Sequence, residues 1–431
     1  MNTRKWVWQA LEAICLEGAY SNLYLQQNLR QVKESDRALA TQIVYGTLQN
    51  GRLLRWQWET KVRRMPSAPV ALLLDLSVYQ LLFLERVPDY AVIHEAVRLC
   101  EERQKGAKGM VNAVLRRVQR EGRRPLPADR WQALGVECSQ PDWLIAMWRA
   151  QYSDEICERI CRSMPQQRGQ SVRVNVMKAD RNELLKSAHY KEGKLSPDAL
   201  VCVQGNAAES REYQEGLISI QDEASQMVAV WMDPQPGERI LDVCSAPGSK
   251  ACHMAEHMHD EGQIVCGDIH PHRVALIEQG AKRLGLHILE TKVMDAAAPA
   301  EAGETPFDGV LCDVPCSGYG VMGRKSDIKA RLDPSAMDTL IPLQQQILQA
   351  ASARVRPGGR LVYSTCTIDP AENQQQIAAF LQRHPEFAVC APEVPLPAGM
   401  TAGEHGCLSV PTRTGMDGFF LCVLQKAAAT Q

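Results

Sequence analysis

The sequence predicts an α/β protein whose main domain is a doubly wound, mostly parallel sheet, preceded by an all-helical domain and a small α+β subdomain. Three observations support this. Apolar residues recur at helical spacing up to about residue 120, strand and helix patterns alternate from about residue 216, and a short mixed stretch lies between. At 431 residues the chain is also too long for one ordinary core. We predict domains at 1–125, 130–215 and 216–428.

The N-terminal region has the pattern of successive helices, with apolar residues such as Val7, Leu11 and Ile14 three or four positions apart. It is also basic. Residues 1–124 contain 20 Lys and Arg against 12 Asp and Glu, whereas residues 125–431 contain 28 against 38. This division is expected when one domain binds a polyanion and another binds a small cation, although solvated helix faces could give the same imbalance.

The last predicted helix of this region, 108–124, places Val111, Leu115 and Val118 on one face and arginines on the other. A row of arginines along one face suits nucleic-acid phosphates, and a solvated surface is the alternative. We define Arg116, Arg117 and Arg120 as the arginine stripe and predict that it contacts RNA. Arg123 and Arg124 continue the stripe in the predicted helix.

A proline-containing linker at 123–129 separates the helical region from the predicted α+β subdomain. In this subdomain residues 171–176, 200–204 and 217–221 have strand patterns, and residues 179–188 read as a helix. Arg173 and Asn175 share one face of their strand. We predict that both contact RNA, with plain surface exposure as the alternative.

The main domain alternates short apolar strands with helices such as 271–284 and 339–355. Alternation of this kind builds a parallel sheet with helices on both faces. The run 419–424 near the end reads as an antiparallel strand. The predicted parallel strands are 239–243, 263–266, 289–293, 309–312 and 360–363.

The first of these strands leads into a loop, CSAPGSK at 244–250, that lacks the glycine fingerprint of dinucleotide sites. Successive strands end in acids that could attract a cation and hold ribose hydroxyls; capping of helices is their alternative role. A ligand with a ribose, a positive charge and no pyrophosphate is S-adenosylmethionine, which we predict as the cofactor. The strand-end acids are Asp242, Asp268, Asp295 and Asp313. The predicted cofactor-binding residues are Cys244, Ser245, Ala246, Pro247, Gly248, Ser249, Lys250, Asp268, Asp295 and Asp313.

Two thiols follow neighbouring strands of this predicted sheet, Cys316 in DVPCSG and Cys366 in STCT. A thiol is needed for methylation at carbon 5 of a pyrimidine, because that carbon becomes nucleophilic only after a thiolate has added to carbon 6. Asp313 could stabilise the ring through its N3 and amino group, and the base would have to leave its stack. The residues alone leave open which thiol attacks.

Several segments carry a family resemblance. ISIQDEASQ at 218–226, SAPGSK at 245–250, DVPCSG at 313–318 and STCTIDPAEN at 364–373 resemble the RNA cytosine-5 methyltransferases of the NOL1/NOP2/Sun group. The runs PDYAVIHEAVRLCEE and KGMVNAVLRRV resemble the RNA-binding helical domain of the NusB family.

The resemblance implies a Rossmann-like, S-adenosylmethionine-dependent methyltransferase that acts on small-subunit ribosomal RNA. It implies Cys366 as the nucleophile, Cys316 as an aid to product release, and Asp313 beside them. Two features depart from the family: Ser249 stands where a glycine is usual, and GRKSDIK at 323–329 lacks the usual histidine–proline pair.

Two other functions remain open: a tRNA cytosine-5 methyltransferase, and an RNA-binding factor without catalysis. Fifteen scattered cysteines indicate a reducing, cytoplasmic setting with free thiols. Cys157 and Cys161 have no second Cys/His pair, so we predict no metal site. We expect a monomer that neither enters nor crosses a membrane.

Overall fold

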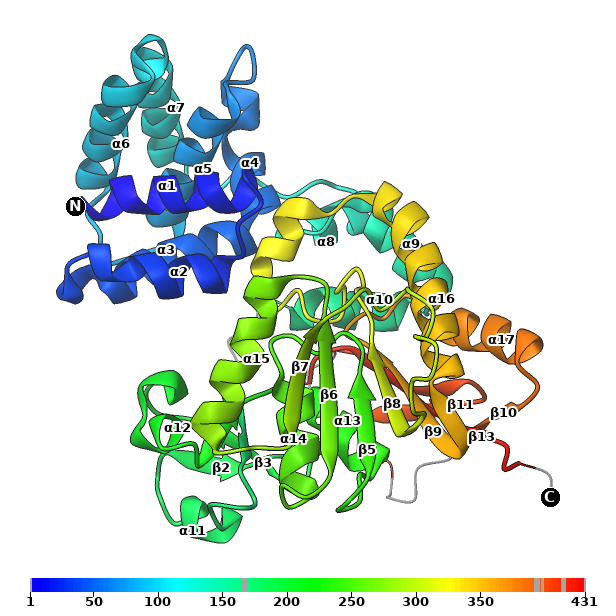
Figure 1. The fold of residues 1–431 in the computed structure, drawn as a ribbon. Helices are drawn as coiled ribbons and strands as arrows, with labels where there is room; N and C mark the ends of the chain where they lie inside the picture. Colours follow the sequence, from blue (N-terminus) through cyan, green and yellow to red (C-terminus); the bar gives the residue numbers. More distant parts are fainter. Residues whose placement is uncertain (1, 165–168, 391–395, 397–398, 412–415, 430–431) are drawn as a thin grey trace. The chain divides into compact units, whose positions relative to one another are not determined.

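The computed structural model describes residues 2–164, 169–390, 396, 399–411 and 416–429. It divides into two compact units (Figure 1). Unit 1 comprises Met1–Gln166 and Met322–Asp333, and unit 2 comprises Gln167–Val321 and Pro334–Gln431. Unit 1 therefore includes a short segment from the C-terminal half of the chain, Met322–Asp333, which we call the inserted segment.

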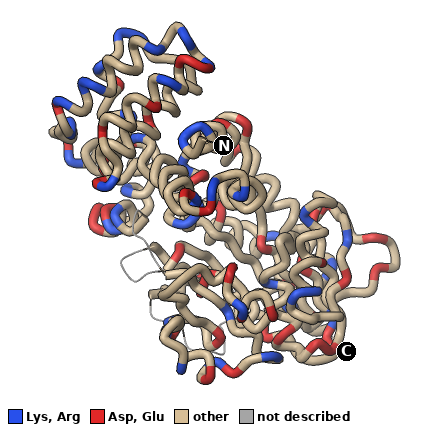
Figure 2. Tube along the Cα trace, turned by 90° about the vertical axis from the view of Figure 1, so that its left-hand side faces the viewer, with Lys and Arg blue, Asp and Glu red and all other residues tan. Residues whose placement is uncertain are grey.

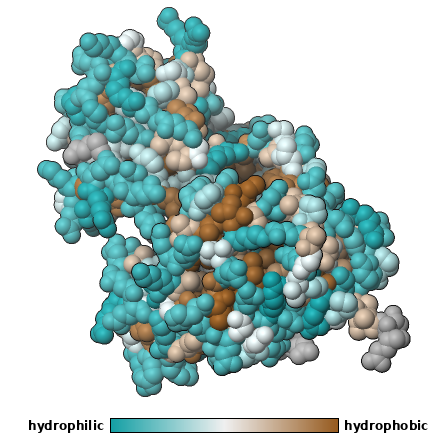
Figure 3. All heavy atoms as spheres, in the orientation of Figure 1, coloured by the Kyte–Doolittle hydropathy of each residue, from teal (hydrophilic) through white to brown (hydrophobic). Residues whose placement is uncertain are grey.

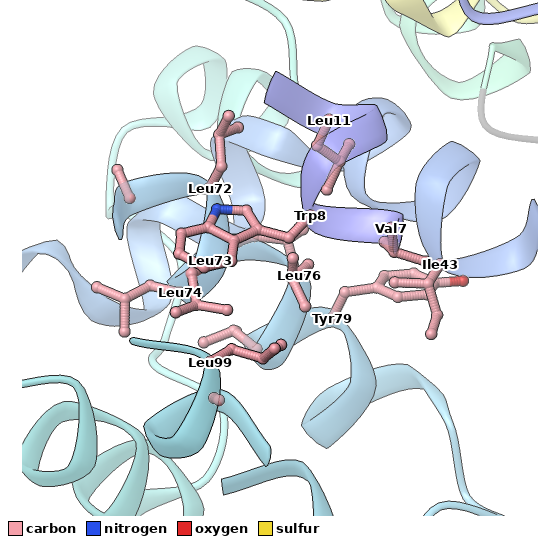
Figure 4. Close-up of a cluster of buried hydrophobic side chains, with 14 of the residues drawn as sticks. Val7, Trp8, Leu11, Ile43, Leu72, Leu73, Leu74, Leu76, Tyr79 and Leu99 are labelled. Carbon is pink, nitrogen blue, oxygen red and sulfur yellow. The ribbon is translucent and has the colours of Figure 1, made fainter. Parts of the chain in front are cut away.

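Unit 1 is helical and packs around α5, whose residues are buried on nearly all sides. Figure 4 shows Trp8 of α1 beside Leu73 and Leu76 of α5. The indole nitrogen of Trp8 donates to the carbonyl of Pro69 at 2.8 Å, so this buried ring keeps a polar partner. The helices are α1 (Thr3–Cys15), α2 (Ser21–Asn28), α3 (Glu34–Gln49), α4 (Gly51–Trp58), α5 (Ala68–Phe83), α6 (Asp89–Arg103), α7 (Lys108–Glu121), α8 (Arg130–Glu137), α9 (Asp142–Gln151) and α10 (Asp154–Ser163), with short 3₁₀ turns η1 (Leu29–Gln31), η2 (Glu59–Lys61), η3 (Lys105–Ala107) and η5 (Ser326–Arg331).

The inserted segment is anchored in unit 1 by buried polar groups. The ammonium of Lys329 donates to the carbonyls of Gln49 and Cys138, at 3.1 and 3.0 Å. Asp327 accepts a hydrogen bond from Ser21 at 2.7 Å. Burial lowers the pKa of Lys329 to about 8, because no carboxylate among the described residues pairs with the ammonium.

This lowered pKa predicts a pH-dependent stability. The unfolded chain binds a proton at Lys329 up to its ordinary pKa, whereas the folded chain releases it near pH 8, so stability rises with pH between these values. We expect the stability of wild type relative to Lys329→Met to rise by about 2 kcal/mol from pH 7 to pH 10. Urea unfolding followed by tryptophan fluorescence measures this, because seven of the eight tryptophans lie in residues 1–166. A stability difference between wild type and Lys329→Met that stays constant with pH would contradict the burial of a charged ammonium.

Unit 2 contains two sheets. The small one has the strand order β2-β3-β1-β4 and is antiparallel; the large one has the order β11-β12-β13-β9-β8-β5-β6-β7, with β10 also paired to β13. The strands are β1 (Gln170–Val174), β2 (Tyr190–Glu192), β3 (Ala199–Cys202), β4 (Ile218–Ile220), β5 (Arg239–Asp242), β6 (Gln263–Asp268), β7 (Leu289–Val293), β8 (Phe307–Asp313), β9 (Val355–Thr365), β10 (Phe387–Cys390), β11 (Met400–Gly403), β12 (Gly406–Ser409) and β13 (Phe419–Lys426). The helices are α11 (Arg181–Leu185), α12 (Arg211–Gln214), α13 (Glu223–Met232), α14 (Ser249–His257), α15 (Pro271–Leu284), α16 (Met337–Ala353) and α17 (Gln374–Arg383), with 3₁₀ turns η4 (Ala207–Glu209) and η6 (Pro334–Ala336).

The large sheet confirms the predicted doubly wound fold. Strands β5 to β9 are parallel, and β13 joins β9 antiparallel. Neighbouring strand residues face opposite ways: Ile240 packs in a cluster with α13, α14 and α15, and Leu241 in a cluster with α16 and α17. β5 lies between β6 and β8, so the strand order reverses there, which is where such sheets bind ligands.

The compact units differ from the predicted domain boundaries in two ways. β4 pairs with β1, with Ile220 opposite Val172, so the small sheet extends beyond residue 215. The helices α8 to α10 group with unit 1 rather than with the small sheet, because the contacts of residues 130–164 lie mainly there. A strand or helix pattern shows what an element is, but it does not show which neighbour covers it. No helix in the described part of the chain is long and apolar enough to span a membrane.

Candidate active site

The two predicted thiols lie together at the edge of the large sheet. β8 and β9 are neighbours, with Asp313 opposite Ser364, and both thiols follow these strand ends. The Sγ atoms of Cys316 and Cys366 are 3.4 Å apart and both residues are partly buried. The nearness of Cys366, followed by burial and the carboxylates of Glu372 and Asp313, raises the pKa of Cys316 well above its ordinary value. Cys316 therefore stays a thiol at neutral pH.

Asp313 is held on both sides by other side chains. Its Oδ2 pairs with the ammonium of Lys250 at 2.6 Å, and its Oδ1 accepts from the hydroxyl of Ser364 at 2.7 Å. Burial lowers the pKa of Lys250, but attraction to Asp313 outweighs burial and the pKa lies above its ordinary value. A thiolate at Cys366 would also be attracted by this ammonium. Lys250 therefore places one positive charge against Asp313 and near enough to Cys366 to attract its thiolate.

A buried network fixes the loop that carries Cys316. Glu372 accepts from the backbone N–H of Ser317 at 2.9 Å and from Gln344 at 2.9 Å, and its own carbonyl accepts from Tyr363 at 2.7 Å. Burial raises the pKa of Glu372. Close backbone approach adds to the constraint, since a Cβ on Gly320 would lie 2.2 Å from the carbonyl oxygen of Gly418. Glu372 lies within the STCTIDPAEN segment, but its role could not be predicted from the sequence.

The predicted cofactor loop connects β5 to α14. Ser245 donates its N–H to the carbonyl of Gly267 at 2.7 Å, which ties the loop to the end of β6. The Ala246–Pro247 peptide is cis, and Gly248 has a φ of 95°. A Cβ on Gly248 would lie 3.0 Å from Ile277, so only glycine fits this turn without strain. Ser249, at the position of a family glycine, begins α14.

The strand-end acids are not equivalent. Asp242 is fully buried, and burial, followed by repulsion from Asp313, raises its pKa to about 7. Asp268 is buried and already pairs with Arg273 at 3.0 Å, and it accepts from the N–H of His270 at 2.9 Å. Asp295 is exposed and accepts from the N–H of Ala297 at 2.9 Å. Arg273 is a neighbour of this rim that the sequence analysis missed.

The prediction that Arg173 and Asn175 contact RNA is corrected by their burial. Arg173 is 0% exposed and forms a two-pronged ion pair with Glu256 of α14, at 2.7 and 3.0 Å. It also donates to Gln221 and, at 2.8 Å, to the carbonyl of Ser249. Asn175 is 1% exposed and donates to the carbonyl of Gly216 at 3.1 Å. Their strand face is covered by other parts of unit 2, so both residues are structural.

The arginine stripe lies on the exposed face of α7, as its spacing predicted, opposite the buried Val111, Leu115 and Val118. Arg117 pairs with Glu121 at 2.6 Å, whereas Arg120, whose side chain is 75% exposed, lies 4.0 Å from the same carboxylate. The helix ends at Glu121, with Gly122 at a φ of 69°. Arg123 and Arg124 therefore leave the helix and donate to the carbonyls of Leu82 and Trp56, at 2.9 Å each. Figure 2 shows basic and acidic residues interspersed along the chain.

Comparison with known proteins identifies the family. The chain is 40% identical to a protein of Bacillus subtilis named "Probable ribosomal RNA small subunit methyltransferase B", over 95% of both chains. It is 33% identical to ribosomal RNA small subunit methyltransferase B of Pseudomonas syringae, over 100% of this chain and 98% of that one. Residues 229–425 match the family model described as 16S rRNA methyltransferase RsmB/F. The chain belongs to the RsmB/F family of methyltransferases.

The remaining matches agree with the domains of an RsmB/F protein. Residues 1–120 match the NusB family model, and residues 140–205 match a ferredoxin-like domain described for RsmF/B-like methyltransferases. The crystal structure of the protein PH0851 superposes with a TM-score of 0.84 and 28% identity, over 99% of both chains. The structure of NSun6 from Pyrococcus horikoshii shares the fold, with a TM-score of 0.61 and 18% identity over 66% of this chain and 98% of that one. These findings confirm the predicted fold class and family resemblance.

Proposed function

We propose that this protein methylates carbon 5 of a cytosine in small-subunit ribosomal RNA, with S-adenosylmethionine as the methyl donor. The observation that carries the proposal is the pair of thiols, Cys316 and Cys366, 3.4 Å apart beside Asp313. Transfer of a methyl group to an exocyclic amine requires no thiol, whereas the ring carbon requires one. The names of the Bacillus and Pseudomonas relatives support small-subunit ribosomal RNA as the substrate.

The residues at the strand ends fit a nucleoside cofactor with a positive charge. Asp268 supplies a carboxylate beside the switch point that can accept hydrogen bonds from ribose hydroxyls, whereas Asp242, whose pKa burial raises to about 7, carries its negative charge only in part at neutral pH. Ile269 and Val293, which follow β6 and end β7, are 56% and 52% exposed and offer an apolar surface for a base. Figure 3 shows hydrophobic residues on the face turned to the viewer. When bound, S-adenosylmethionine supplies an electrophilic methyl group.

Three side chains, those of Cys366, Asp313 and Cys316, have separate roles in the reaction on the cytosine. The Cys366 thiolate, attracted by Lys250, bonds to carbon 6, and the electrons of the ring double bond become available at carbon 5. Asp313 accepts a hydrogen bond from the amino group of the cytosine and, once protonated, donates one to N3, where the negative charge develops. After methylation, the carbon 5 proton passes to water, and the electrons of that C–H bond restore the double bond as the bond to the Cys366 sulfur breaks. Cys316, as a thiol, can protonate the departing sulfur.

Incubation of the protein with S-adenosylmethionine carrying a labelled methyl group tests the proposal. Label should appear in 5-methylcytosine of small-subunit ribosomal RNA and not in tRNA. Label in tRNA alone would favour the tRNA alternative. Transfer to no RNA pool, including ribosomal RNA extracted from cells lacking the protein, would favour a non-catalytic RNA-binding factor.

The arginine stripe gives a separate prediction about RNA binding. Replacing Arg116 and Arg120 by Glu should weaken RNA binding about tenfold or more at low salt, because exposed cations on one face release counterions from phosphates. The slope of log affinity against log salt should also become less steep. Arg117, which pairs with Glu121, should have a smaller effect and serves as the matched control. An unchanged slope in the double variant would assign the stripe to the solvated surface.

A further inference from the structure

A group of potential metal ligands lies in unit 2 outside the thiol site. Oδ2 of Asp198 is 2.9 Å from Nε2 of His253 and 2.8 Å from Nε2 of His257. The three ligand atoms all lie within 4.8 Å of one another. His253 is 0% exposed and the side chain of Asp198 is 11% exposed, whereas that of His257 is 25% exposed. The group is therefore closed on one side and open to solvent beside His257.

The chain builds this group from two elements. His253 and His257 are four residues apart on α14, so both rings project from the same face of the helix. Asp198 immediately precedes β3 of the small sheet, and its backbone is fixed by a hydrogen bond from Val174 of β1 to the Asp198 carbonyl at 2.9 Å. The two rings cross edge to face at 84°, with centroids 4.7 Å apart, so their Nε2 atoms converge on the carboxylate without stacking. A His-x₃-His pattern was visible in the sequence; its carboxylate partner, 55 residues away, was not.

The charges around the group favour a cation. The ion pairs of Asp198 within the described chain involve only the two histidines, with no lysine or arginine. The nearby Arg173 is matched by Glu256, both 0% exposed, so this pair leaves the negative charge of Asp198 uncancelled. Two imidazoles would have to donate to a single carboxylate oxygen if no ion were present. That hydrogen-bonded arrangement is the competing explanation for the geometry.

We infer that Asp198, His253 and His257 bind one divalent transition-metal ion, with a water completing the set on the open side. Two imidazoles and a carboxylate suit Zn²⁺, Co²⁺ or Ni²⁺, whereas Mg²⁺ and Ca²⁺ prefer all-oxygen sets. Ligands about 2.0–2.1 Å from a tetrahedral ion lie roughly 3.3 Å from one another. The distances from Oδ2 of Asp198 to the two Nε2 atoms, 2.9 and 2.8 Å, would therefore have to lengthen by about half an ångström. His257 lies on the last turn of α14 and can move toward solvent.

The ion would link the small sheet to the helix that follows the cofactor loop. α14 begins with Ser249 and Lys250, and its last residue is His257. A metal bound to its last turn and to Asp198 would therefore restrain the end of α14 where Glu256 also pairs with Arg173 of β1. This role is structural and does not depend on the proposed reaction.

Titration of the metal-free full chain with Co²⁺ tests the inference. We expect one equivalent to bind with a visible d–d absorption, without a sulfur-to-cobalt charge-transfer band, and to be displaced by Zn²⁺. His257→Gln should weaken binding at least about 100-fold, because loss of an outer-shell partner alone costs roughly 10–100-fold. His287→Gln is the matched control. His287 is exposed and pairs with Asp260, but that pair contains a single imidazole, so the variant should bind Co²⁺ as wild type does. Metal should also slow hydrogen exchange in α14.

His257→Cys keeps the result interpretable if the glutamine variant folds poorly. It should restore binding and add a sulfur-to-cobalt charge-transfer band, which only direct ligation at position 257 can produce. A charge-transfer band in wild type would instead place the ion at cysteines such as Cys316 and Cys366. The inference would be overturned by such a band in wild type. It would also be overturned by the absence of saturable Co²⁺ binding, or by equal Co²⁺ binding in wild type and His257→Gln.

Discussion

Cys366→Ala is expected to abolish methyl transfer to RNA, with a loss of at least about 10⁴-fold in rate. Carbon 5 of cytosine has no nucleophilic character until a thiolate adds to carbon 6, so no other step can replace the attack. The variant should also form no covalent complex with RNA. The rate of labelled methyl transfer and electrophoresis under denaturing conditions measure the two effects.

Cys316→Ala is expected to behave in the opposite way. Cys366 can still add to the base, but the thiol 3.4 Å away that would assist its departure is missing. Methylated RNA should therefore remain bonded to the protein, and a complex that resists denaturation should accumulate during a single turnover. Cys390→Ala, which removes an exposed cysteine on β10, should leave both readouts at the wild-type level. Accumulation of the adduct in Cys366→Ala instead would reverse the two roles.

The sequence predicted the parts of this site that depend on strand order. An apolar run that ends in Asp313 and another that ends before Cys366 indicate buried strands, and the right-handed connections of a parallel sheet bring such ends together. The predicted strand at 289–293 matches β7 residue for residue. The nearness of the two thiols follows from the same rule.

Contacts that depend on packing between elements could not be predicted in this way. The alternating pattern of β1 places Arg173 and Asn175 on one face, but it does not show that the face is covered by α14 and the end of α15. Lys250 is 63 residues from Asp313, and its direction depends on where α14 begins. The inserted segment has no periodicity that reveals its attachment to unit 1. Each of these features requires knowledge of which surfaces meet.

Arg173→Met is expected to destabilise unit 2 by about 3–5 kcal/mol. The change leaves Glu256 buried without its cation, and a buried unpaired charge is more costly than the absence of the whole pair. Arg173→Met/Glu256→Gln should therefore recover part of the loss. Arg211→Met, which breaks the exposed Arg211–Glu215 pair, is the matched control and should leave stability at the wild-type level. Hydrogen exchange of peptides from β1 and α14 is the suitable measurement, because Trp231 is the only tryptophan among residues 167–431.

The pH dependence distinguishes loss of charge pairing from loss of packing. Burial raises the pKa of Glu256, and Arg173 offsets this only in part, so removal of Arg173 should raise the pKa further. A raised pKa in the folded state means that the folded chain holds the proton longer than the unfolded chain, so stability falls as pH rises. The destabilisation by Arg173→Met should therefore grow between pH 5 and pH 8, and the double variant should show no such growth. Weaker RNA binding by Arg173→Met with unchanged exchange in β1 and α14 would restore the original prediction of an RNA contact.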